Sequence, residues 1–156
     1  MRPLFALSVL ALAACSEGGD PIPPRPGPPT PGPALAGVDL SKPVRALGTE
    51  PFWSVELTGT EMVYTTPEPP ERRAPQPDPV VQGTTATWET ETTDGSPLTV
   101  TLVATECSDG MSDRIYPLTA LVRVGALALN GCAASSAAVM STGESGPVVE
   151  KAQPAV

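Results

Sequence analysis

The sequence predicts an all-β fold, a small antiparallel barrel or sandwich of about six strands. Three observations lead to this prediction. The 156 residues include 21 Pro and 14 Gly, which disfavour a bundle of long helices. Several segments alternate apolar and polar side chains with a period of two, and short turn signals separate these segments. We therefore expect one β-domain over residues 38–133.

The first expected hairpin covers residues 52–65. In its first strand Trp53, Val55 and Leu57 fall on one face, and Glu56 falls on the other. A Thr-Gly-Thr turn can follow, and the residues after it alternate back along the second strand. Because Trp53 is a large apolar side chain in a domain with few aromatics, we expect it to anchor the core.

Two further strand pairs are expected. One covers residues 80–91 and 98–106, and an Asp-Gly turn signal separates its β-branched runs. Its threonines suit the half-exposed side of a sheet. The other pair covers residues 118–124 and 126–130, with a single glycine between the strands. Together with the first hairpin, these pairs give six strands.

Proline and small residues mark the segments outside these strands. Residues 67–79 contain six prolines and are expected to form a surface loop. Eight prolines fall within residues 21–33, so residues 15–37 are expected to form a semi-rigid linker without helix or central strand. Residues 134–156 are rich in Ala, Ser and Gly and lack aromatics, which predicts a disordered tail.

The N-terminus has the plan of a signal peptide over residues 1–14. Met1 and Arg2 precede a run of twelve residues that carries no charge. As a helix, such a run would span about 18 Å, which is short of the roughly 30 Å hydrocarbon core of a bilayer. We therefore expect this segment to be cleaved rather than to remain as a membrane span.

The run ends in Leu-Ala-Ala-Cys at residues 12–15, which resembles the lipobox of bacterial lipoproteins. The resemblance implies that Cys15 is lipidated and becomes the mature N-terminus, and two or more acyl chains anchor a protein stably to a membrane. Ser16 is similar to the residue found in lipoproteins that are sorted to the outer membrane, facing the periplasm. An ordinary secretory signal with an incidental cysteine is the alternative.

With Cys15 assigned to lipid, Cys107 and Cys132 remain as a pair in an exported, oxidising compartment. This predicts a disulfide between them. The competing interpretation is a redox or metal dithiol, but the sequence has no Cys-x-x-Cys pattern and no third soft ligand. We expect no metal and no cofactor.

Three segments together resemble a family of uncharacterised bacterial envelope lipoproteins. They are Gly-Thr-Glu-Pro-Phe-Trp at residues 48–53, Cys-Ser-Asp-Gly-Met-Ser-Asp-Arg-Ile-Tyr-Pro at residues 107–117, and Gly-Cys-Ala at residues 131–133. The resemblance covers residues 45–133 and implies a periplasm-facing all-β domain, without implying a reaction. The proline-rich insertion at residues 67–79 is longer than the family pattern leads us to expect.

The middle segment allows two interpretations. As a structural loop, its Asp109 and Asp113 would cap backbone amides, while Met111 and Ile115 would fill the end of the core. As a functional loop held by a disulfide, it would present Asp109, Asp113 and Arg114 to a partner. A calcium site is disfavoured because the Asp-x-Asp-x-Asp-Gly spacing is missing.

Three more residues complete the candidate binding set. Glu50 and Trp53 fit first a strand start and a core anchor, and alternatively an acidic and an aromatic side chain on a binding face. Tyr116, followed by Pro117, starts the next expected strand.

Composition limits the chemistry that the chain can perform. The absence of His removes imidazole bases, Ser-His-Asp triads and Cys-His pairs. Seventeen acidic residues against nine basic ones give a net charge of −8, which offers nucleic acid no basic footprint. We expect no catalytic residues, although a hydrolase with paired carboxylates stays open as an alternative.

The leading hypothesis is a non-catalytic, lipid-anchored envelope lipoprotein that binds a protein, a peptidoglycan fragment or a small ligand through its β-domain. The second hypothesis is an inhibitor of C-type lysozyme, a class of small disulfide-bonded β-barrels. An acidic domain would be attracted to such a strongly basic enzyme.

Overall fold

The computed structural model describes residues 32–150 and confirms the all-β class. Its elements are β1 (Ala34–Leu35), β2 (Val38–Asp39), β3 (Val44–Thr49), β4 (Phe52–Leu57), β5 (Glu61–Thr65), β6 (Arg72–Pro75), β7 (Val80–Gln82), β8 (Thr85–Glu91), β9 (Pro97–Val103), β10 (Asp113–Ile115), β11 (Leu118–Val124), β12 (Leu127–Ser135), α1 (Ser136–Ser141) and β13 (Ser145–Pro147). Strands β1 and β2 form one small sheet, β10 and β13 form another, and the remaining nine strands form the main sheet.

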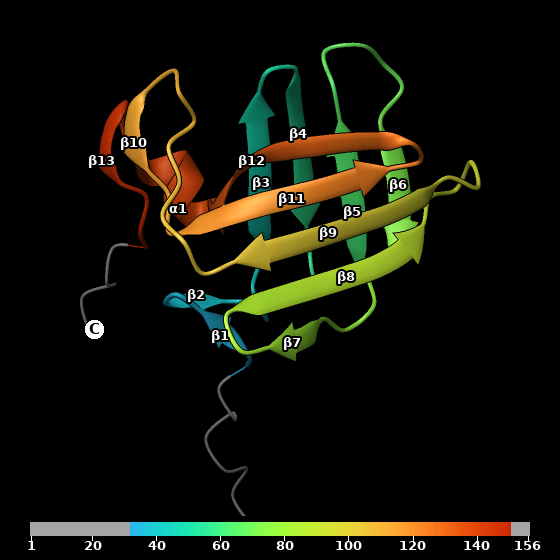
Figure 1. Cartoon of the computed structure of the whole chain (residues 1–156), viewed down its shortest axis with the longest axis horizontal. Helices are drawn as coiled ribbons and strands as arrows, with labels where there is room; N and C mark the ends of the chain where they lie inside the picture. The colour runs from blue at the N-terminus through green and yellow to red at the C-terminus, as the bar shows by residue number, and fades with distance from the viewer. Residues whose placement is uncertain (1–31, 151–156) are drawn as a thin grey trace, which may run out of the picture.

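The main sheet is antiparallel and curls into a half-barrel. Its strand order is β6-β5-β4-β3-β12-β11-β9-β8-β7. In Figure 1, strands β3 to β6 stand upright behind β8, β9, β11 and β12, which run across them. The expected count of six strands is therefore too low. The three expected strand pairs are present as β4–β5, β8–β9 and β11–β12. The expected strand over residues 80–91 is divided into β7 and β8, which pair with each other. Gly95 provides the positive φ of 82° that the Asp-Gly turn requires.

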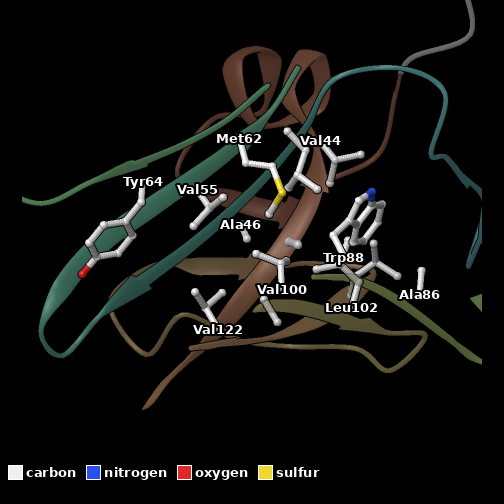
Figure 2. Packing of buried hydrophobic residues seen from close by; sticks show 14 of the residues in the cluster. Val44, Ala46, Val55, Met62, Tyr64, Ala86, Trp88, Val100, Leu102 and Val122 are labelled. Carbon is white, nitrogen blue, oxygen red and sulfur yellow. The ribbon is translucent and has the colours of Figure 1, made fainter. Parts of the chain in front are cut away.

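The hydrophobic core lies between the upright strands and the crossing strands. Period-two alternation sends Trp53, Val55 and Leu57 inward, as expected, and leaves Glu56 on the outer face. Figure 2 shows Val55, Met62 and Tyr64 of the upright half together with side chains of the crossing half, namely Trp88, Val100, Leu102 and Val122. Burying such side chains contributes roughly 1.5–3 kcal/mol each.

The proline-rich insertion is part of the sheet, which corrects the prediction of a loop over residues 67–79. Strand β6 pairs with β5 at one sheet edge, and its Ala74 is buried. Strand β7 follows after four residues and pairs with β8 at the opposite edge. One extended segment, residues 72–82, therefore forms both edges of the curled sheet. Prolines are tolerated there because an edge strand needs only half of its backbone donors.

Both predicted boundaries of the folded region are corrected. Leu35 lies in β1 and is buried in the core, so folded structure begins before residue 38. Residues 134–150 are not a disordered tail, because they complete β12 and form α1 and β13. Ser135 caps α1 by accepting a hydrogen bond from the amide of Ala138 at 3.2 Å. Val148, just after β13, is fully buried. Residues 1–31 and 151–156, with the predicted signal peptide and Cys15, lie outside the described residues.

A second, smaller core cluster lies where α1 and β13 meet β12. It consists of Tyr116, Cys132, Ala134, Ala138, Val139 and Val148. The predicted disulfide is present: Cys107 and Cys132 are joined, with 5.4 Å between their Cα atoms. Closing a loop with a sequence separation of 25 residues stabilises a fold by about 3.5 kcal/mol in the chain-entropy account.

Candidate functional site

The three sequence motifs meet where two neighbouring strands of the main sheet separate. Strands β3 and β12 pair from Val44–Ser135 to Leu47–Cys132, and their pairing ends there. Beyond that point the strands border a hollow of about 480 Å³, which we call the corner pocket. Its lining residues are Gly48, Thr49, Glu50, Cys107, Ser108, Asp109, Gly110, Met111, Thr119, Asn130 and Gly131. All three motifs thus contribute to one surface.

Two glycines allow the strands to approach the Trp53 indole at this corner. A Cβ atom on Gly131 would lie 2.0 Å from the carbonyl oxygen of Leu47, and one on Gly48 would lie 2.2 Å from Nε1 of Trp53. Neither position can hold a side chain without a shift of the backbone. Trp53 is only 4% exposed, which confirms its role as a core anchor and contradicts its alternative role as an exposed binding aromatic.

Asp109 organises the loop that covers the pocket. Its carboxylate accepts hydrogen bonds from the amides of Met111 at 3.0 Å and Ser112 at 2.8 Å. The hydroxyl groups of Ser112 and Tyr116 donate to the same carboxylate, at 2.8 and 3.2 Å. Partial burial alone would raise the pKa of Asp109, but these donors outweigh burial and hold the pKa below its ordinary value. Asp109 is therefore an ionised cap, as the structural interpretation predicts.

Backbone hydrogen bonds join the two ends of the loop to each other, and one threonine attaches the loop to β3. The amide of Cys107 donates to the carbonyl of Tyr116 at 3.0 Å, and the amide of Tyr116 donates back at 2.8 Å. Thr49, at the end of β3, donates its hydroxyl to the carbonyl of Asp109 at 2.9 Å. Tyr116 itself is buried, and burial raises its pKa. These contacts hold the loop against the corner of the sheet.

Arg114 connects the loop to the segment that follows α1. Its guanidinium donates to the carbonyl oxygens of Gly143 at 2.7 Å and Thr142 at 2.9 Å, just after α1. Asp113 is exposed, and its backbone pairs with Ser145 in the parallel β10–β13 ladder. Asp113 was predicted to cap a backbone amide, but its carboxylate accepts no hydrogen bond from residues 32–150.

The apolar residues of the motifs lie on the outside. Met111 and Ile115 were expected to fill the core, but they are 68% and 47% exposed. The expectation fails because Tyr116 fills that part of the core instead. Phe52 is 53% exposed and lines an adjacent outer groove of about 390 Å³, which it shares with Thr49 and Asp109. Its exposure follows from the alternation that turns Trp53 inward, so the sequence contained this signal.

Of the six candidate binding residues, the structure gathers five around the pocket and the groove. Glu50 and Asp109 line the corner pocket, whereas Trp53, Asp109, Arg114 and Tyr116 line the outer groove. Glu50 is exposed at the β3–β4 turn, and Asp113 lines neither hollow. Asn130 is exposed on β12 and faces the same pocket, although no sequence motif pointed to it as a binding residue.

Comparison with known proteins found no matching family model, no matching curated protein and no matching solved structure. The resemblance to envelope lipoproteins therefore stays a prediction. Within residues 32–150, no cluster of Cys, Asp and Glu side chains has a metal-binding arrangement. The single helix in this part of the chain is too short to cross a bilayer.

Proposed function

We propose that the chain is a non-catalytic, lipid-anchored envelope lipoprotein that binds a partner at the disulfide-held corner of its β-domain. The observation that carries the proposal is a contrast among the motif residues. Asp109 and Arg114 are engaged by hydrogen bonds within the protein. Phe52 and Met111 are left exposed beside the two hollows. Aromatic residues and methionine are enriched at protein interfaces.

The rigidity of the corner supports a binding role. The Cys107–Cys132 disulfide, the Asp109 cap and the Thr49 hydroxyl hold the loop in one conformation. A surface that is already ordered loses little conformational entropy when a partner binds. The bonds that hold the loop therefore also keep the exposed side chains of Phe52 and Met111 in a fixed position for contact with a partner.

The electrostatics of the corner favour binding over acid–base catalysis. A carboxyl that acts as a general acid near neutral pH needs a raised pKa. The pKa of Asp109 is shifted in the opposite direction. The other carboxylate of the pocket, Glu50, is exposed at a turn.

Site-specific photocrosslinking in cells of the source organism tests the proposal. A benzophenone amino acid would replace Phe52 or Met111, and Val80 on β7 would serve as an equally exposed control position. We expect the same protein adduct from Phe52 and Met111 and none from Val80. Adducts that are absent, or equally strong from Val80, would remove the corner as a binding surface.

A further inference from the structure

The corner pocket is acidic. Among residues 32–150, its charged lining residues are Glu50 and Asp109, both acidic. Asp109 already accepts four hydrogen bonds from its own loop. Glu50 is exposed and makes no hydrogen bond or ion pair within the described chain. One carboxylate is thus available to a ligand, and the second adds to the negative field.

The walls of the pocket fit an extended side chain with a polar end. Met111 lines one side and is 68% exposed, so its thioether side chain offers apolar contact along the pocket. Asn130 lies on the β12 side and contributes an amide group. Gly48 and Gly131 also line the pocket, and the Trp53 indole lies directly against both of them. Lysine and arginine combine an apolar stem with a charged head, which suits such a pocket.

We infer that the corner pocket receives a lysine or arginine side chain of a protein partner, with its cationic head at Glu50 and its aliphatic stem along Met111. This inference rests on the proposed function and specifies the chemistry of the partner. The net charge of −8 of the full chain acts in the same direction, because it steers a basic surface toward this protein.

The neighbouring outer groove sets the orientation of the partner. It lies on the other side of the contact between Thr49 and Asp109 and contains Arg45, Arg114 and the exposed Phe52. An acidic hollow and a groove with two arginines therefore stand side by side, with apolar residues at both. A partner is favoured when its basic side chain lies in the acidic corner pocket and a neighbouring apolar side chain lies beside it. A partner turned the other way would place its basic side chain next to the two arginines of the groove.

NMR titration of the uniformly ¹⁵N-labelled full-length protein in nonionic detergent tests the inference. The probe is the blocked peptide acetyl-Gly-Lys-Gly-amide, and the control is the same peptide with norleucine, which has the stem without the charge. We expect the lysine peptide to shift the amide signals of Glu50, Met111 and Asn130. Because a partly exposed ion pair is weak, Glu50→Gln should lower the affinity by about two- to fivefold.

Two further variants keep the result interpretable. Glu89→Gln removes a similarly exposed carboxylate on β8, far from the pocket residues in the sheet order, and should leave the titration unchanged. Asn130→Asp adds a carboxylate to the pocket and should tighten lysine binding. Equal shifts with norleucine, or equal affinities for wild type, Glu50→Gln and Asn130→Asp, would overturn the inference.

The two proposals can fail separately. Crosslinks from Phe52 and Met111 that persist unchanged in a Glu50→Lys variant would preserve the binding role of the corner and refute the basic side chain. Lysine-dependent shifts at Glu50 without any crosslinked protein would preserve the pocket chemistry and refute the proposed cellular role.

Discussion

Asp109 shows how one residue can organise a whole motif. Its carboxylate is bound by donors from Met111, Ser112 and Tyr116, so a single side chain holds the loop, the buried tyrosine and the strand that follows. Hydrogen bonds to an ionised acceptor are stronger than those between neutral groups. The Asp-Gly-Met-Ser order of the motif is explained by this cap, because a short loop must present two consecutive amides to one carboxylate.

The Asp109 cap predicts a pH-dependent stability. Asp109→Asn should lower the free energy of unfolding by about 1–3 kcal/mol at pH 7, because the replacement has no charge and turns a donor toward donors. The folded-state pKa lies below the ordinary value of 3.8. The stabilisation is therefore complete above that pH and is lost as the pH falls through the lower, folded-state pKa.

Chemical denaturation at a series of pH values measures this effect. The difference between wild type and Asp109→Asn should shrink below pH 3.8. Asp113→Asn is the matched control, because Asp113 is exposed in the same loop, and its effect should stay within about 0.5 kcal/mol. A difference for Asp109→Asn that does not change with pH would contradict the role of the charge.

Gly131 provides a steric prediction at the same corner. Gly131→Ala places a Cβ atom 2.0 Å from the Leu47 carbonyl and 2.8 Å from the Trp53 ring, so the strands must move apart. We expect a loss of at least about 2 kcal/mol. Gly143→Ala has no neighbouring atom within 4 Å of the new methyl group and should be nearly neutral. Equal melting temperatures for the two variants would show that the corner is packed loosely enough to accept a methyl group at residue 131.

At the level of elements, alternation alone predicts the strands whose inward side chains are large. Strand β4 is recognisable because Trp53, Val55 and Leu57 alternate with smaller or polar residues. Strand β3 has the same burial pattern, but its inward positions are Val44, Ala46 and Gly48, which give a weak apolar signal. Its place in the sheet depends on close approach to neighbouring strands, and no local pattern encodes that.

Strands β6 and β13 and helix α1 were not predicted, for a related reason. Strand β6 lies among prolines, which disfavour strands everywhere except at sheet edges, and edge position is a property of the finished fold. The segment from Ser135 onward is rich in small residues, so its composition is similar to that of a disordered tail. The loop of residues 107–117 was predictable as a turn and a cap, whereas the outward direction of Met111 depended on how Tyr116 packs.

The order of the C-terminal segment can be tested with two adjacent valines. Val148 is fully buried in the second core cluster, and Val149 is 52% exposed. Val148→Ala should lower the free energy of unfolding by about 1–3 kcal/mol, through lost burial and the cavity that remains. Val149→Ala should change it by less than about 0.5 kcal/mol. If both changes proved neutral in denaturant titrations, β13 would not be part of the cooperative fold.

At the scale of the whole molecule, the described chain begins at one end of the β-domain, and the candidate site lies at the other. In Figure 1 the chain enters near β1 and β2 at the bottom, whereas the turn from β3 to β4 is at the top. An anchor at Cys15, ahead of eight prolines in residues 21–33, would attach to the end opposite the corner pocket. That placement would direct the proposed binding surface away from the membrane and toward a partner.

The anchor gives the last prediction. Cys15→Ser should move the protein from the membrane fraction to the soluble fraction, because a serine hydroxyl cannot form the thioether that carries the diacylglyceryl group. The net charge of −8 repels an anionic bilayer, so electrostatic attraction does not replace the lipid. Each buried CH₂ of an acyl chain contributes about 0.8 kcal/mol to membrane binding, so losing the chains changes the partition completely.

Fractionation followed by immunoblotting measures the effect, and Ser16→Ala, which keeps the thiol, should stay with the membrane. If Cys15→Ser remained in the membrane pellet after a high-salt wash, the lipid would not be what holds the protein there, and the orientation of the corner pocket relative to the bilayer would have to be argued from another contact.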